Sequence, residues 1–282
     1  MQRRKIYYRK FLSAAVTAIS FACLLVALGA MCWIIATVVW YGGAKINFTF
    51  LFESSKPYGA MYGGIGNAIL GTFIITLGAG AMALPPALAG GIYLSEFDRE
   101  SRFAKSIQFG ANVMMGIPSI VIGLFVYAAI VIPMGSFSGF AGSVALAIIM
   151  FPVILRTTEE MLAMIPDSLR EAALALGMTR RQATLHILCR TARRGIITGV
   201  LMAFARVSGE TAPLLFTALW SDSWPTGYFH SPTANLPVLI TEYTANSPFQ
   251  AQYAAGWGAA LVVMTLMLVL NLSVRFIMRE RV

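Results

Sequence analysis

The sequence predicts an all-α, polytopic membrane protein with six transmembrane helices. Of its 282 residues, 58% are hydrophobic and only 12% are charged, whereas soluble domains carry about 25% charged residues. The apolar residues gather into long runs, and a helix that crosses the hydrocarbon core of a bilayer needs about 20 mostly apolar residues. Six segments meet this requirement. They are residues 11–40, 67–95, 107–132, 138–155, 196–220 and 255–277.

The first apolar run follows a basic N-terminus, as the apolar region of a signal peptide does. The apolar region of a signal peptide has about 7–15 residues. This run is much longer and shows no convincing cleavage site, so we expect it to be retained as a helix. We divide the chain accordingly. Residues 1–66 hold an N-terminal cytoplasmic segment, this peripheral helix and an outer loop, and residues 67–282 form the core with a cytoplasmic loop at 166–194.

Proline placement separates two kinds of span. Spans two to five contain proline, and the first and sixth do not. Because proline in a membrane helix frees a backbone carbonyl, it needs neighbouring protein or a water-lined cavity. Spans two to five are therefore expected to surround a pathway, unless these prolines only reflect the higher proline content of membrane helices. The prolines are Pro85, Pro86, Pro118, Pro152 and Pro213.

The distribution of basic residues predicts the orientation. Eighteen of the 21 Lys and Arg residues lie in the N-terminus, the second and fourth connections and the C-terminal tail, whereas the opposite loops hold only Lys45 and Lys56. Lys and Arg accumulate in cytoplasmic loops, so both termini are predicted to be cytoplasmic. The net charge of +9, which in a soluble protein would suggest nucleic acid, has the same explanation.

The longest polar segment, residues 166–194, is predicted to fold as two helices. Ser168 and Glu171 fit a capping box that starts the first helix, and Gly177 can end it in the left-handed conformation. Thr179 to Gln182 repeats the capping pattern and starts a second helix. The alternatives are a solvated amphipathic loop and a DNA-binding helix-turn-helix, the latter disfavoured because membrane helices tether both ends.

This loop resembles the EAA loop of ABC-importer permeases. The matching residues are Glu171-Ala172-Ala173, Gly177 and Ile187. The resemblance implies a coupling helix that inserts into a cleft of an ATP-binding subunit. The residues expected to serve this coupling are Ser168, Arg170, Glu171, Ala172, Ala173 and Gly177.

The end of the loop departs from the EAA pattern. Cys189 and Arg190 stand where the family has Leu and Pro. We therefore expect the second helix to continue without a proline break towards the fifth span.

Three further stretches, residues 116–125, 155–160 and 209–218, resemble the A-type permease (PstA) of bacterial phosphate-specific importers. The resemblance implies a type I ABC-importer permease fold in the bacterial inner membrane and one half of a phosphate pathway. It also implies three partners: a homologous C-type permease subunit, a dimeric ATP-binding subunit and a periplasmic or extracellular phosphate-binding protein.

Two charged residues stand four apart in the otherwise apolar fifth span, Arg206 and Glu210. An intramembrane charge normally has a partner and a function, and guanidinium can bind two phosphate oxygens in parallel. Arg206, Glu210 and Thr211 are therefore candidates for the substrate pathway, with Arg156 as an exit-side anion contact. The alternatives are that Arg206 and Glu210 only join helices and that Arg156 only anchors the inner end of its span.

The chain itself carries no signature of catalysis. It has no Gly-Lys pair and hence no Walker A motif, and its three cysteines and two histidines show no metal-ligand spacing. We expect a transporter subunit, not an enzyme, with no cofactor of its own, whose partner ATPase uses ATP and Mg²⁺. A permease for another oxyanion or small solute, or a transporter that needs no ATPase, remains the alternative.

Overall fold

The structure is a computed structural model that describes residues 2–57, 63–97, 99 and 101–278. It is 79% helical and has no strand among these residues, which confirms the predicted all-α class. The helices are α1 (Gln2–Gly43), α2 (Phe48–Phe52), α3 (Gly66–Glu96), α4 (Arg102–Gly116), α5 (Ser119–Val126), α6 (Ile132–Met134), α7 (Gly139–Ala163), α8 (Asp167–Ala175), α9 (Arg180–Gln182), α10 (Cys189–Val207), α11 (Ala212–Leu215), α12 (Leu236–Thr241) and α13 (Gln250–Met278). Three π-helical segments adjoin them: η1 (Tyr127–Val131), η2 (Ala183–Leu188) and η3 (Glu242–Asn246).

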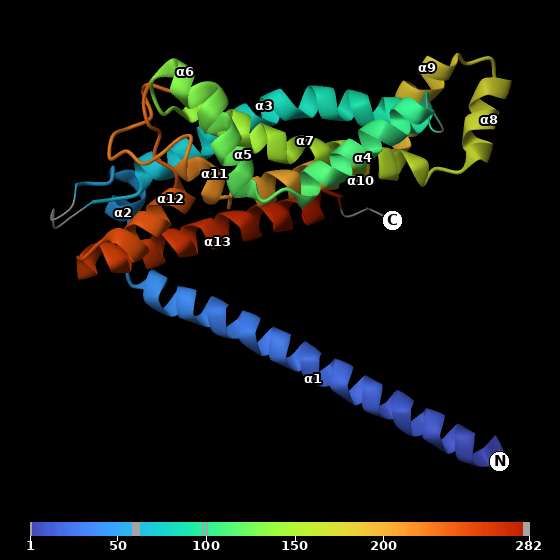
Figure 1. Cartoon of the computed structure of the whole chain (residues 1–282), viewed down its shortest axis with the longest axis horizontal. Helices are drawn as coiled ribbons and strands as arrows, with labels where there is room; N and C mark the ends of the chain where they lie inside the picture. The colour runs from blue at the N-terminus through green and yellow to red at the C-terminus, as the bar shows by residue number, and fades with distance from the viewer. Residues whose placement is uncertain (1, 58–62, 98, 100, 279–282) are drawn as a thin grey trace.

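The helices α3 and α7 form the centre of the bundle and share its most extensive contact (Figure 1). Their close approach depends on small residues, because a Cβ added at Gly91 of α3 would lie 2.6 Å from the Leu155 carbonyl oxygen of α7. Fully buried side chains such as Leu146 and Met150 fill the centre. Helices α4 and α10 also pack against α7. The proline-containing spans to which these helices belong, which were predicted to form the core, therefore do pack together.

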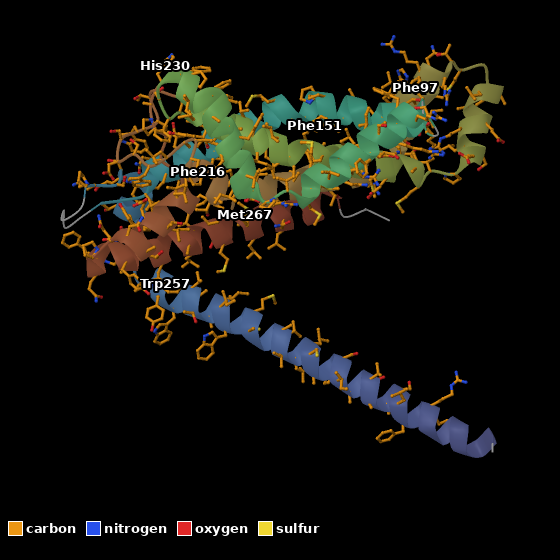
Figure 2. The ribbon with its side chains drawn as sticks, viewed as in Figure 1. Phe97, Phe151, Phe216, His230, Trp257 and Met267 are labelled. Atoms are coloured by element: carbon orange, nitrogen blue, oxygen red, sulfur yellow. The ribbon has the colours of Figure 1, made fainter. Side chains whose placement is uncertain are left out.

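Helix α1 diverges from this bundle (Figure 1). None of its apolar stretch is buried within the chain, and it meets α13 near its C-terminal end, where the rings of Tyr41 and Trp257 lie 5.5 Å apart. Figure 2 shows the side chains of α1 projecting on all sides of a helix that leads away from the bundle, with Trp257 at the junction. The apolar surface of α1 is thus available to lipid or protein outside this chain.

The predicted count of six spans is not confirmed. Among the described residues, four helices are long and apolar enough to cross a membrane: Arg9–Gly43, Gly66–Glu96, Gly139–Ala163 and Gln250–Ser273. A fifth span results if α4 and the segment Ser119–Met134, which meet at an angle of 100°, are counted together.

The predicted fifth span, residues 196–220, is broken. Helix α10 ends at Val207, and a non-helical stretch separates it from the short α11. Gly209 in this stretch has a low helix propensity, and Pro213 lacks a backbone N–H and disfavours the helical conformation of the residue before it. After α11 the chain folds back, and Thr233 donates its N–H to the Ala218 carbonyl at 2.9 Å.

Candidate functional site

A small cavity lies where two helical breaks meet. It encloses about 200 Å³ and is lined by Met114, Met115, Ile117, Pro118, Ser119, Ile122, Ile149, Val153, Arg206 and Glu210. One break is the 100° bend between α4 and α5 at Pro118, and the other follows α10. Arg206 and Glu210 are the charged residues in this otherwise largely apolar lining.

Arg206 and Glu210 face each other loosely across the end of α10. Arg206 Nε and Glu210 Oε1 lie 3.9 Å apart, and 53% of the Arg206 side chain but only 19% of the Glu210 side chain is exposed. The position at a helix C-terminus favours the Arg206 cation because the backbone carbonyls there carry partial negative charge. An arginine held by one long contact keeps most of its donors available for an incoming anion.

The other two pathway candidates do not line this cavity among the described residues. Thr211 directly precedes α11, where its carbonyl accepts the N–H groups of Leu214 and Leu215 at 3.1 Å. Arg156 lies one helical turn beyond Val153 on α7.

Arg156 is held by its own helix. Its Nη1 donates to Glu159 Oε2 at 2.7 Å and its Nη2 to Glu160 Oε1 at 3.4 Å. The buried Glu159 also accepts from Gln108 of α4. These contacts place Arg156 beside Glu159 and Glu160, as in the anchoring alternative, and Glu159 in turn joins α7 to α4 through Gln108.

The loop at 166–194 forms two helical pieces, as predicted, but the first begins differently. Pro166, not Ser168, precedes α8, and no side chain caps it, so the capping box predicted from Ser168 and Glu171 is wrong. Proline restricts its own φ and suits a helix start, which places Ser168 inside the first turn, exposed to solvent.

The turn between the two pieces is as predicted. Gly177 has a φ of +81°, which is the left-handed conformation that glycine adopts without steric cost. The N–H groups of Gly177 and Met178 bond to the carbonyls of Leu174 and Ala173 at 2.9 and 3.3 Å, the pattern of a Schellman cap.

The second piece also begins and continues as predicted. Thr179 and Gln182 make the reciprocal capping box. From α9 the chain stays helical through η2 and α10, and the Cys189 N–H bonds to the Thr184 carbonyl. Arg190, which stands where the EAA pattern has proline, lies in the first turn of α10 with helical residues on both sides, and a proline there would lack a backbone N–H. The departure from the EAA pattern therefore coincides with an unbroken helix.

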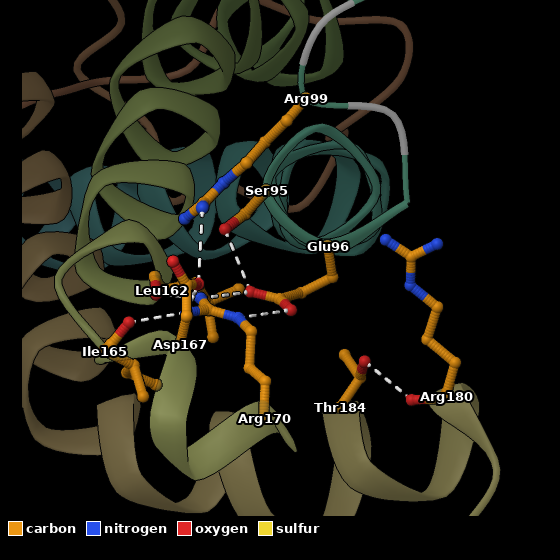
Figure 3. A network of polar contacts seen from close by, with 9 residues as sticks. All are labelled: Ser95, Glu96, Arg99, Leu162, Ile165, Asp167, Arg170, Arg180 and Thr184. Carbon is orange, nitrogen blue, oxygen red and sulfur yellow. Dashed lines mark hydrogen bonds and ion pairs between the residues drawn. The ribbon is translucent and has the colours of Figure 1, made fainter. Parts of the chain in front are cut away.

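The six coupling candidates divide between two faces of the loop. Ser168, Glu171, Ala172 and Gly177 are exposed, whereas Ala173 is buried and Arg170 turns towards α3. There Arg170 pairs with Glu96, the last residue of α3 (Figure 3). Our interpretation of the sequence missed Glu96; the available signal was an acidic residue that directly ends an apolar span.

Comparison with known proteins agrees with this architecture. The family model for the binding-protein-dependent transport system inner membrane component matches residues 87–281. The chain is 40% identical to the phosphate transport system permease protein PstA of Haemophilus influenzae over 99% of this chain and 98% of that protein. It is 38% identical to the protein of the same name from Yersinia pestis over 99% of this chain and 94% of the relative.

A solved structure shares the fold. The inward-facing MetNI methionine ABC transporter superposes with a TM-score of 0.59 at 18% identity, over 77% of this chain and 93% of that chain. With a family match over more than half the sequence and nearly full-length relatives, the chain belongs to the family of inner membrane components of binding-protein-dependent transport systems, in its phosphate permease branch.

Proposed function

We propose that this chain is a transmembrane permease subunit of an ATP-driven phosphate importer, forming half of the translocation pathway. The observation that supports this most directly is the pair Arg206 and Glu210 in a cavity between two helical breaks. Relatives that match the chain over nearly their full length are named phosphate transport system permease proteins.

The chemistry of the cavity suits a transient anion site. Phosphate is an anion at neutral pH, and guanidinium donates two parallel hydrogen bonds to it. Because Glu210 lies near the same guanidinium, an incoming phosphate would compete with a carboxylate. That competition keeps phosphate binding weak, as transport requires release.

The exposed face of α8 is proposed as the contact with the ATPase. Glu171, Ala172 and Leu174 are exposed on this short helix, and Leu176 directly after it is 83% exposed. Apolar and small side chains on one helix suit insertion into a groove of a partner. ATP and Mg²⁺ would be used by that partner, a dimeric ATP-binding subunit, and not by this chain.

The remaining partners complete the proposed importer. They are a homologous C-type permease subunit and an external phosphate-binding protein. In this arrangement both termini of the chain lie in the cytoplasm. Closure of the ATPase dimer would draw the cytoplasmic loops together and open the pathway to the opposite side. The separation of residues 1–66 from the core stays a prediction.

The decisive experiment is purification of the chain from its native membrane in detergent, followed by reconstitution of the purified complex. We expect an ATPase and a second permease to copurify and phosphate uptake into proteoliposomes to require ATP and the binding protein. Excess sulfate should not compete. Effective competition by sulfate would favour a permease for another oxyanion, and uptake without any ATPase would contradict the proposal.

A further inference from the structure

The guanidinium of Arg170 joins three helices at one point (Figure 3). Nε and Nη2 donate to the two carboxylate oxygens of Glu96 at 3.1 and 2.8 Å. Nη2 also donates to the Leu162 carbonyl in the last turns of α7 at 2.8 Å. Nη1 donates to the Ile165 carbonyl and, at 3.0 Å, to Asp167 Oδ1. Arginine has five N–H donors, so this set of contacts uses its full donor capacity.

The contact between Arg170 and Glu96 is shielded from water. The side chains are 16% and 4% exposed, respectively, and Ser95 Oγ donates to Glu96 Oε1 at 3.1 Å. The hydrogen bond with Glu96 raises the pKa of Arg170, although burial opposes the charge. A carboxylate this deeply buried depends on its partner, because an uncompensated buried charge is strongly unfavourable.

Few residues of α8 contact the helical bundle, and Arg170 is one of them. Ala173 is the buried residue of this helix, and Leu169 packs at the edge of a small apolar cluster, whereas Glu171 and Ala172 are exposed. Helix α8 also contacts η2, which leads into α10. A force on the exposed face of α8 would therefore reach α10 through η2, and α3 and the end of α7 through the guanidinium of Arg170.

The helices that Arg170 binds lead to the candidate pathway. Glu96 is the last residue of α3, and α3 and α7 form the tightly packed centre of the bundle. About two turns before Leu162, α7 contributes Val153 to the cavity of Arg206 and Glu210. A rigid pair of helices thus connects the Arg170 contact with that cavity.

We propose that Glu96 and Arg170 are positioning residues that transmit movement of α8 to α3 and α7, and that the coupling of ATP hydrolysis to transport depends on this ion pair. This inference rests on the proposed function, in which α8 docks on an ATPase. Arginine is required at position 170 because a lysine has only three donors, fewer than the five contacts made here, and lacks the planar fork that binds both oxygens of the carboxylate.

The test is the amount of ATP hydrolysed per phosphate transported by the whole complex in proteoliposomes, with saturating binding protein. Glu96→Gln, Arg170→Gln and Arg170→Lys should each raise this ratio by about 2- to 30-fold, the range found for residues that carry coupling between sites. The double variant Glu96→Gln/Arg170→Gln should raise it no further than the stronger single variant, because residues that act as one unit are not additive.

Arg99→Gln is the matched control. It removes an arginine beside the same contact whose ion pair with Asp167 is long, at 3.9 Å, and exposed, and it should leave the ratio unchanged. If Arg170→Gln lowers the amount of assembled complex, Glu96→Gln, which keeps the side-chain volume, provides the same measurement.

The outcomes separate the two proposals. A normal ratio in both Glu96→Gln and Arg170→Gln, in a complex that transports phosphate, overturns the role of the ion pair and leaves the proposed function standing. A wild-type complex that does not use ATP to transport phosphate overturns both.

Discussion

Arg206 Nε and Glu210 Oε1 lie 3.9 Å apart across the non-helical stretch that follows α10. Had α10 continued, the two residues would be neighbours one turn apart on a regular helix. The break instead places Glu210 beside the bend at Pro118 in a shared cavity. The pair therefore belongs to an irregular region, which is where a membrane protein can line a pathway with polar groups.

Removal of the Arg206 charge should impair transport. Arg206→Gln is expected to lower phosphate uptake by about 10- to 100-fold at unchanged complex levels, because charged hydrogen bonds contribute about 1.5–3 kcal/mol. Arg206→Lys should retain part of the activity. Arg102→Gln, which removes an exposed charge at the start of α4, serves as the control. Full uptake by the Arg206→Gln complex would mean that the pair only joins helices.

Loss of Arg156 should destabilise the protein. Arg156→Gln would leave the buried Glu159 without its ion pair, at a cost of up to about 3–5 kcal/mol. The unfolding temperature of the purified complex is expected to fall, and Glu159→Gln added to Arg156→Gln should restore part of it. A variant of normal stability with reduced uptake would instead assign Arg156 to the exit of the pathway.

The contact between α5 and α11 should be intolerant of added volume. A Cβ at Gly123 would lie 2.6 Å from Pro213 Cα, so Gly123→Ala is expected to destabilise the complex by about 1–3 kcal/mol. Gly110→Ala is the matched control, since a Cβ there meets nothing within 4 Å and alanine favours a helix. Equal unfolding temperatures for the two variants would show that α5 and α11 separate easily.

The turn after α8 should require glycine for ATPase docking. Gly177 has a φ of +81°, and an alanine in this left-handed conformation is less stable by about 1–2 kcal/mol. If docking requires this turn, Gly177→Ala should lower the affinity for the ATPase subunit by roughly 5- to 30-fold. Gly177→Asn should lose less, because asparagine tolerates the left-handed conformation. Titration of the ATPase against the reconstituted permease measures both affinities, and wild-type affinity for Gly177→Ala would mean that docking does not select this turn.

The fold class and much of the cytoplasmic loop could be predicted because their signals are local. Apolar runs specify membrane helices wherever they lie, and the Thr179–Gln182 capping box and the turn at Gly177 depend on residues within a few positions of each other. The start of α8 was the local error, since Pro166 rather than Ser168 precedes the helix.

Hydropathy alone overestimated the continuity of the fifth span. Residues 196–220 read as one apolar run, but Gly209 and Pro213 interrupt the helix. The apolar part of α10 beyond Arg194 comprises about 13 residues, or roughly 20 Å at 1.5 Å per residue, which is short of the hydrocarbon thickness of about 30 Å.

The sequence by itself determined that this protein is an all-α membrane protein with a two-part cytoplasmic loop, because composition, apolar runs and capping depend on neighbouring residues. Only the tertiary structure decided which residues meet across the fold. Glu96 and Arg170 are 74 positions apart, and no local pattern encodes their contact. It exists because the packing of α3 against α7 brings the end of α3 beside α8 and buries a carboxylate there, and a buried carboxylate must be paired.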